Sequence, residues 1–264
     1  MNSANKLYIF ISTNKFIFVS YNSLVATSVK YKTFIFNPRY SANANMHEAV
    51  KNIDFTKEEY NSINIILDSS FTTIPLMEFD EENISDIYFY NLPEKKERKK
   101  VLYDTLPHMG MILLYAIDKD LHHTLTEYFQ EINISCSHTA MLMHCVSLSN
   151  INNENITLIA YLNGQEMLLS LIKKHSILQT NIFQLHNAED AEYYILNWYN
   201  LFQFDTKEET IILIGDDAQR IKQKLTQYVA NVQIASQSEE LNNHPLTSCS
   251  ELPYEMVVAM LHAY

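Results

Sequence analysis

Four side chains that commonly bind zinc lie in one short segment: Cys136, His138, His144 and Cys145. Structural zinc sites favour two closely spaced ligand pairs joined by a flexible segment. The apolar pattern here predicts that Cys136 and His138 share a strand and point the same way. It places His144 and Cys145 in the following helix, where their side chains diverge. Because free cysteine packs as a small hydrophobic residue, we expect buried cysteines, hydrogen-bonded histidines and no metal site.

The chain is poor in glycine, with three among 264 residues. Average usage of about 7% would give about 18. Loops that bind phosphate need glycine, because their N–H groups must approach the anion closely and often adopt positive φ. Gly164 is explained by a hairpin turn after Asn163, and Gly215 by a tight strand-to-helix turn that Asp216 or Asp217 caps. The sequence therefore offers few places for a phosphate-binding loop.

Charge and cysteine content narrow the class of protein. The net charge is −12 and hydrophobic residues make up 47%, which favours a globular protein and argues against nucleic-acid binding. The run 94–100 holds five cations; it is typical of a solvated linker, with a phosphate-binding or partner-docking patch as the alternative.

Three cysteines, Cys249 being the last, make no disulfide framework. No secretory signal or membrane span is evident, so we expect a cytoplasmic protein.

In the first half, the pattern predicts three strands followed by alternating helices and strands, with an insertion after the first helix. The opening runs of β-branched and aromatic residues indicate a hairpin, and Asp118 is placed to cap a helix. The apolar run 111–117 is typical of a buried parallel strand, whereas 84–90 fits a helix or a strand. Strands are predicted at 7–11, 16–19, within 24–36, and at 63–68, 71–75, 111–117 and 132–137, and helices at 45–60, after Asp118 and at 140–148.

After a polar joint at 151–154 the same order begins again. Asn163-Gly164 between two apolar runs is a strong hairpin signal. Strands are predicted at 156–162, 167–172, 176–185, 210–214 and 232–235, and helices at 188–202, after Asp216 or Asp217, and from Pro253. Two meanders, each followed by alternating helices and strands, predict mixed α/β sheets with helices packed on them.

This duplicated order resembles the actin-like ATPase superfamily, which includes actin, sugar kinases and heat-shock chaperones, and whose layout also occurs in the pilus-assembly protein PilM. More closely, the chain resembles a family of proteins of unknown function, number 3822, with an actin-like ATPase fold. The resemblance rests on the hairpin 7–19, the stretch 63–75 with Phe79, the meander 156–185 and the closing helix. The resemblance implies a duplicated, ribonuclease H-like α/β fold with two lobes: 1–150, with an insertion at about 62–100, and 151–264.

Active members of the superfamily place an aspartate and glycines in the first turn of each lobe and rest adenosine on a glycine pair. Here the turn from Ser12 to Lys15 has neither acid nor glycine, and two acids that would repel a polyphosphate follow Gly215. We therefore expect no catalytic residue, cofactor or metal. The leading hypothesis is a non-catalytic scaffold whose partner is a protein or peptide, received between the lobes or at the edge of segment 71–75.

The alternative is a divergent nucleotide-binding ATPase or kinase that uses the cleft between the lobes. Its phosphate contacts would be Ser12, Thr13, Lys15, Asn163, Gly164 and Gly215, and Asp216 or Asp217 would lie near the metal. A small-molecule sensor that uses the same cleft is a third hypothesis, which no particular residue supports. Stabilisation of the fold by Mg-ATP would distinguish the enzyme from the scaffold.

Overall fold

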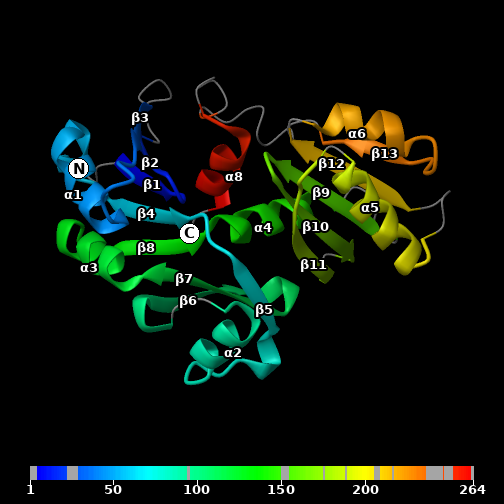
Figure 1. Ribbon diagram of the computed structural model, residues 1–264, viewed down its shortest axis with the longest axis horizontal. Helices are drawn as coiled ribbons and strands as arrows, with labels where there is room; N and C mark the ends of the chain where they lie inside the picture. The colour runs from blue at the N-terminus through cyan, green and yellow to red at the C-terminus, as the bar shows by residue number, and fades with distance from the viewer. Residues whose placement is uncertain are drawn as a thin grey trace. The chain divides into compact units, whose positions relative to one another are not determined.

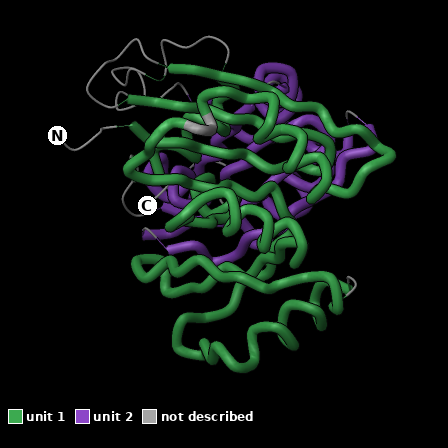
Figure 2. Tube along the Cα trace, turned by 90° about the vertical axis from the view of Figure 1, so that its left-hand side faces the viewer, with its two compact units in different colours: residues 1–141, 244–264 green, residues 142–243 purple. Residues whose placement is uncertain are grey.

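The computed structural model describes residues 5–22, 29–93, 96–149, 155–174, 176–187, 189–204, 209–215, 217–235, 246 and 252–262. The chain divides into two compact units: residues 1–141 with 244–264, and residues 142–243 (Figure 2). The predicted second lobe extends to residue 264, whereas helix α8 (Tyr254–His262) groups with the first unit. The predicted joint at 151–154 lies outside the described residues.

The first unit is built on a five-stranded sheet with the order β3-β2-β1-β4-β8 (Figure 1). Strands β1 (Asn5–Ile11), β2 (Lys15–Asn22) and β3 (Lys30–Ile35) form an antiparallel meander. Strand β4 (Ser62–Leu67) pairs parallel with β1, and β8 (Ile132–Cys136) pairs parallel with β4. The opening hairpin is therefore confirmed. Positions 23–28, part of the predicted third strand, lie outside the described residues.

Helices α1 (Ala42–Asn52), α3 (Lys119–Tyr128) and α4 (Ser137–Ser149) connect or follow these strands. The predicted cap of α3 is confirmed, because the Asp118 carboxylate accepts the N–H groups of Asp120 and Leu121 at 3.0 and 3.2 Å. Short 3₁₀ segments occur at Asp54–Lys57, Leu76–Glu78, Lys96–Arg98 and Pro107–Met109.

A second, three-stranded sheet lies in the chain between β4 and α3. It has the order β5-β7-β6 and consists of β5 (Phe71–Pro75), β6 (Lys99–Leu106) and β7 (Met111–Asp118). Helix α2 (Ile84–Asn91), the segment that fitted a helix or a strand, packs on it through Ile84 and Tyr88.

Two expectations about this region are wrong. The run 111–117 is buried, but it pairs antiparallel with both neighbours because it is the centre of a meander and not part of a β-α-β unit. The cationic run is not wholly a linker, because Lys99 and Lys100 begin β6. Glu94 and Lys95, at the start of that run, lie outside the described residues.

The second unit repeats the first sheet strand for strand. Its order is β11-β10-β9-β12-β13, where β9 (Thr157–Asn163), β10 (Glu166–Lys173) and β11 (Ser176–Gln184) form an antiparallel meander. Strand β12 (Thr210–Gly215) pairs parallel with β9 and with β13 (Val232–Ile234). The duplication predicted from the sequence is confirmed.

Helices α5 (Asp190–Leu201) and α6 (Ala218–Leu225) follow β11 and β12. Trp198 of α5 lies in the core of this unit, and the Tyr194 ring stacks on Phe183 of β11 with ring centroids 4.3 Å apart. In the first unit, α8 buries Met256 to Met260, and the Tyr8 hydroxyl donates a hydrogen bond to the Met260 carbonyl at 3.3 Å. Among the described residues, no helix is long and apolar enough to cross a bilayer.

Candidate functional site

The first candidate is the turn between β1 and β2, where the alternative hypothesis placed phosphate contacts. The Ser12 N–H and hydroxyl both donate to the Lys15 carbonyl, at 3.1 and 3.3 Å. The turn therefore uses its first amide and its hydroxyl to close on itself. Thr13 and Lys15 are exposed. This geometry is that of a hairpin turn and forms no cradle of free amides for an anion.

A cysteine–histidine pair lies at the carboxyl end of β8 in the same unit. His138 belongs to the first turn of α4, and not to the strand as predicted. Its Nδ1 lies 3.6 Å from the buried Cys136 Sγ, and its ring lies beside Phe71. Burial raises the pKa of Cys136 and lowers the pKa of His138 to about 4. At neutral pH the pair is a neutral thiol beside a neutral imidazole, so the thiol is not an activated nucleophile.

The other members of the cysteine–histidine cluster lie further along α4. Both His144 and Cys145 are buried, and burial raises the pKa of Cys145 to about 12. The expectation of buried cysteines is confirmed for Cys136 and Cys145. Cys249 lies outside the described residues.

A partly buried carboxylate that was not predicted from the sequence joins the three-stranded sheet to the start of α4. Asp104 of β6 accepts hydrogen bonds from the Tyr115 hydroxyl at 2.9 Å, the Cys136 N–H at 2.9 Å and the Thr139 hydroxyl at 2.5 Å. Burial raises the pKa of Asp104, and the donors partly oppose this. Burial also raises the pKa of Tyr115. Because the protein itself supplies these donors, Asp104 acts as a structural anchor.

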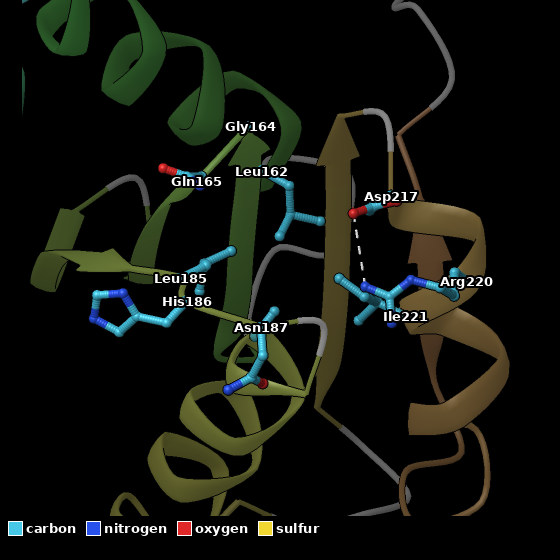
Figure 3. A pocket seen from close by; sticks show the side chains of 10 residues that line it. Leu162, Gly164, Gln165, Leu185, His186, Asn187, Asp217, Arg220 and Ile221 are labelled. Carbon is cyan, nitrogen blue, oxygen red and sulfur yellow. Dashed lines mark ion pairs between the residues drawn. The ribbon is translucent and has the colours of Figure 1, made fainter.

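The second unit contains a pocket of about 400 Å³ at the ends of its strands (Figure 3). The end of β9, the β9–β10 turn, the segment after β11 and the first turns of α5 and α6 form its walls. Its lining combines apolar side chains with neutral polar and charged ones: Leu162, Gly164, Gln165, Leu185, His186, Asn187, Ala191, Asp217, Arg220 and Ile221.

Gly164 lines the pocket and Gly215 ends the neighbouring strand β12, and both have positive φ. Gly164 has φ +58° in the tight turn between β9 and β10, as a two-residue hairpin turn requires. Gly215, at the end of β12, has φ +108°, and a Cβ on it would lie 2.0 Å from the Leu162 carbonyl oxygen. Gly215 is therefore explained by close backbone approach inside the sheet.

The amino end of α5, beside the pocket, is occupied by the chain's own side chains. The Asn187 Oδ1 accepts the N–H groups of Glu189 and Asp190, at 3.0 and 3.1 Å. In return the Asp190 carboxylate accepts the N–H groups of His186 and Asn187, at 2.7 and 3.1 Å. These bonds, that of His186 first, lower the pKa of Asp190. The arrangement is a reciprocal capping box, so internal side chains hold both the first amides of the helix and the two amides that precede it, which a phosphate would otherwise contact.

Replacing Asn187 with alanine should lower the free energy of unfolding by about 1 kcal/mol, since an amino-terminal cap is lost. The matched control is Asn197→Ala, an exposed position within α5, which should leave stability unchanged or raise it slightly. Urea unfolding followed by the fluorescence of Trp198, the single tryptophan, measures both. Equal midpoints for the two variants would mean that the cap contributes nothing.

Two basic side chains of α6 form ion pairs with carboxylates of the same unit. Arg220 lies 3.6 Å from carboxylate oxygens of both Asp217 and Glu192, and Figure 3 shows the Asp217 pair beside the pocket. Lys224 lies 2.8 Å from Glu192. The cation on the pocket wall therefore carries neighbouring carboxylates that oppose a polyphosphate.

The structure brings together only part of the residue set named by the alternative hypothesis. Gly164 and Asp217 line the same pocket, Asn163 and Gly215 end the adjacent strands, and Ser12, Thr13 and Lys15 lie in the other unit. Asp216 lies outside the described residues. Asp217 is the N-cap residue of α6, but its side chain makes no capping hydrogen bond.

Two residues of the pocket region were not predicted from the sequence. The spacing of Asn187 to Asp190 is a capping-box signal that could have found the first. The spacing of Asp217 and Arg220 is an i, i+3 charge pair that could have indicated the second, whereas its other carboxylate neighbour, Glu192, lies on a different helix.

Comparison with models of protein families assigns the chain to one of them. Residues 2–232 match the family described as "Protein of unknown function (DUF3822)". The chain belongs to this family. No curated protein matches it.

Solved structures show the fold of this DUF3822 chain. A protein from Bacteroides thetaiotaomicron, described as having an actin-like ATPase fold and unknown function, is 23% identical with a TM-score of 0.77, covering 94% of this chain and 95% of its own. A chain of the PilM–PilN type IV pilus biogenesis complex is 13% identical with a TM-score of 0.53, covering 97% and 96%. The fold is the actin-like ATPase fold, and the resemblance inferred from the sequence is confirmed.

Proposed function

We propose that this chain is a non-catalytic protein-interaction or scaffold protein of the cytoplasm that keeps an actin-like ATPase fold without a nucleotide site. The observation that carries the proposal is the capping box of α5. Asn187 accepts the N–H groups of Glu189 and Asp190 at the start of α5, and Asp190 accepts those of His186 and Asn187 just before it, so an entering phosphate would have to displace these side chains. Helix amino ends bind anions only when their amides are available.

Two further features support the loss of nucleotide binding. The β1–β2 turn closes on itself through Ser12 and supplies no carboxylate to organise a metal ion. The close contact of β12 with β9 explains Gly215 without a role in adenosine binding. The family model and the fold leave the biological role open, so the proposal rests on these local features.

Two observations support a protein or peptide as the partner: the nature of a structural neighbour and the outer edge of one strand. The relative with a TM-score of 0.53 is a chain of a two-protein complex. In the present chain β5 ends its sheet and pairs with β7 alone among the described strands. Its outer edge can receive an extended peptide by strand addition. Nucleic acid is disfavoured as a partner because the net charge is −12.

Thermal melting with and without Mg-ATP tests the proposal. A ligand at about 100 times its dissociation constant stabilises a fold by about 2.7 kcal/mol, which would raise the melting temperature by several degrees. We expect no shift with Mg-ATP relative to magnesium alone, and no phosphate release. A shift that Asp217→Asn removes, while an exposed control such as Asp86→Asn keeps it, would overturn the proposal in favour of a nucleotide-binding enzyme.

A further inference from the structure

Strand β11 is the outer strand of its sheet and pairs with β10 alone among the described strands (Figure 1). With nine residues it is the longest edge strand that the structure describes, and it contains no charged residue and no proline. Proteins usually protect such edges with charges, proline or short length. Three other described edges follow this rule: β3 carries Lys30 and Lys32, β6 begins with two lysines, and β13 has three residues. The remaining edge strands, β5 and β8, have five residues each.

The pairing with β10 shows which backbone groups of β11 point outward. The Leu185 N–H donates to the Gln165 carbonyl at 2.7 Å, in the same register as the β10–β11 ladder. Hydrogen-bonded residues alternate along an antiparallel strand, so Thr180, Ile182 and Gln184 direct their N–H and C=O groups away from β10. The Ile182 N–H donates at 2.9 Å to the side chain of Asn181, its neighbour in the chain, as an amide outside the ladder would.

The two ends of β11 carry opposite charges. Lys173 and Lys174 are exposed before its first residue. Beyond its last residue lie Glu189, whose side chain is 70% exposed and lies 3.8 Å from Lys224, and Asp190, whose carboxylate accepts the N–H groups of His186 and Asn187. Two copies of this edge placed antiparallel would bring the lysine end of each against the acidic end of the other. A chain with a net charge of −12 repels its own copies in general, but this edge is self-complementary.

We propose that two copies of this chain pair antiparallel through β11 and form a two-fold symmetric dimer, in which the two five-stranded sheets continue into one another. Registers centred between residues 180 and 182 pair β11 with itself and bring Lys174 toward the end of β11 that precedes α5 in the second copy. The register shift near Leu171 and Ile172 sets Leu178 outside the regular ladder, so the outward-facing stretch from Thr180 onward supplies the pairing. In a two-fold symmetric pair, a lysine faces an acid at both ends of the paired strands. This favours a second copy of the chain over an extended peptide of another protein.

Sedimentation velocity over a range of concentrations tests this at low and high salt. We expect a concentration-dependent dimer that weakens as salt screens the end charges. Asn181→Lys puts a cation in the middle of the edge and should leave the protein monomeric. Asn197→Lys, an exposed position on α5 with the same charge change, is the matched control and should still dimerise. Circular dichroism melting verifies that both variants are folded.

Charge reversal gives the sharper measurement. Lys174→Glu and Glu189→Lys should each weaken the homodimer by about tenfold or more, since each places like charges at both ends of the paired edge. An equimolar mixture of the two variants should dimerise again, because every contact at the ends of the heterodimer is then between opposite charges. A wild type that stays monomeric, an Asn181→Lys variant that still dimerises, or a mixture that stays monomeric would each overturn the proposal.

Discussion

Replacing Gly215 with alanine should lower the free energy of unfolding by about 3 kcal/mol or more, the largest effect that we expect from a single methyl group. The residue has φ +108°, and its added Cβ would lie 2.0 Å from the Leu162 carbonyl oxygen and 3.0 Å from the carbonyl carbon. Both atoms belong to the backbone of β9, which pairs with β12 at this point. The strands would have to separate before the methyl group could fit.

Gly164→Ala is the matched control for this experiment. Gly164 also has positive φ, at +58°, but a Cβ on it would have no atom within 4 Å beyond its chain neighbours. Its substitution should cost about 1 kcal/mol, the conformational penalty of a left-handed residue without a clash. Urea unfolding monitored by Trp198 fluorescence compares the two variants. Similar losses for both would show that close approach to β9 does not explain Gly215.

Replacing Asp104 with alanine should also destabilise the protein by about 3 kcal/mol. The Cys136 N–H and the Thr139 hydroxyl would lose their acceptor, the Tyr115 hydroxyl would keep only the Ile134 carbonyl, and each unsatisfied donor is costly. The exposed control is Asp86→Ala, which removes a surface ion pair with Lys96 and should change stability by about 0.5 kcal/mol or less. Losses of equal size for the two variants would contradict the role of Asp104 as an anchor.

The sign of the pH dependence at Asp104 follows from its raised pKa. Its folded pKa lies above its ordinary value of 3.8 because burial disfavours the charge, so the folded state holds the proton more tightly than the unfolded chain. The Asp104 contribution to stability therefore increases as the pH falls from neutrality through the folded pKa. Asp104→Asn cannot make this gain. Wild type should gain stability relative to that variant on acidification, and urea midpoints at several pH values measure the difference.

Local patterns in the sequence were enough to predict the two meanders and most connecting helices. The Asn163-Gly164 hairpin, the Asp118 cap and the apolar face of α5 each arise from residues close in the chain, and propensity and periodicity report such features directly. The duplicated order of strands followed from them. The fold class could therefore be predicted from the sequence alone.

The features that the sequence did not predict depend on partners distant in the chain. An apolar run such as 111–117 is equally typical of a central antiparallel strand, and only its pairing with β5 and β6 decides. Asp104 is one more polar residue in the sequence until Cys136 and Thr139 are brought to it. Likewise, two of the pocket-lining turns were identified as turns, but their convergence with Asn187 and Arg220 is a tertiary property.

The discontinuity of the first unit has a consequence for biosynthesis. The second unit is one continuous segment, 142–243, whereas the first also needs residues from 244 onward (Figure 2). As the ribosome makes the chain from its amino end, the second unit is complete before the first receives α8, which buries five residues and accepts the Tyr8 hydrogen bond. Until then the apolar surface that α8 covers is open to solvent, a state in which nascent chains commonly need chaperones.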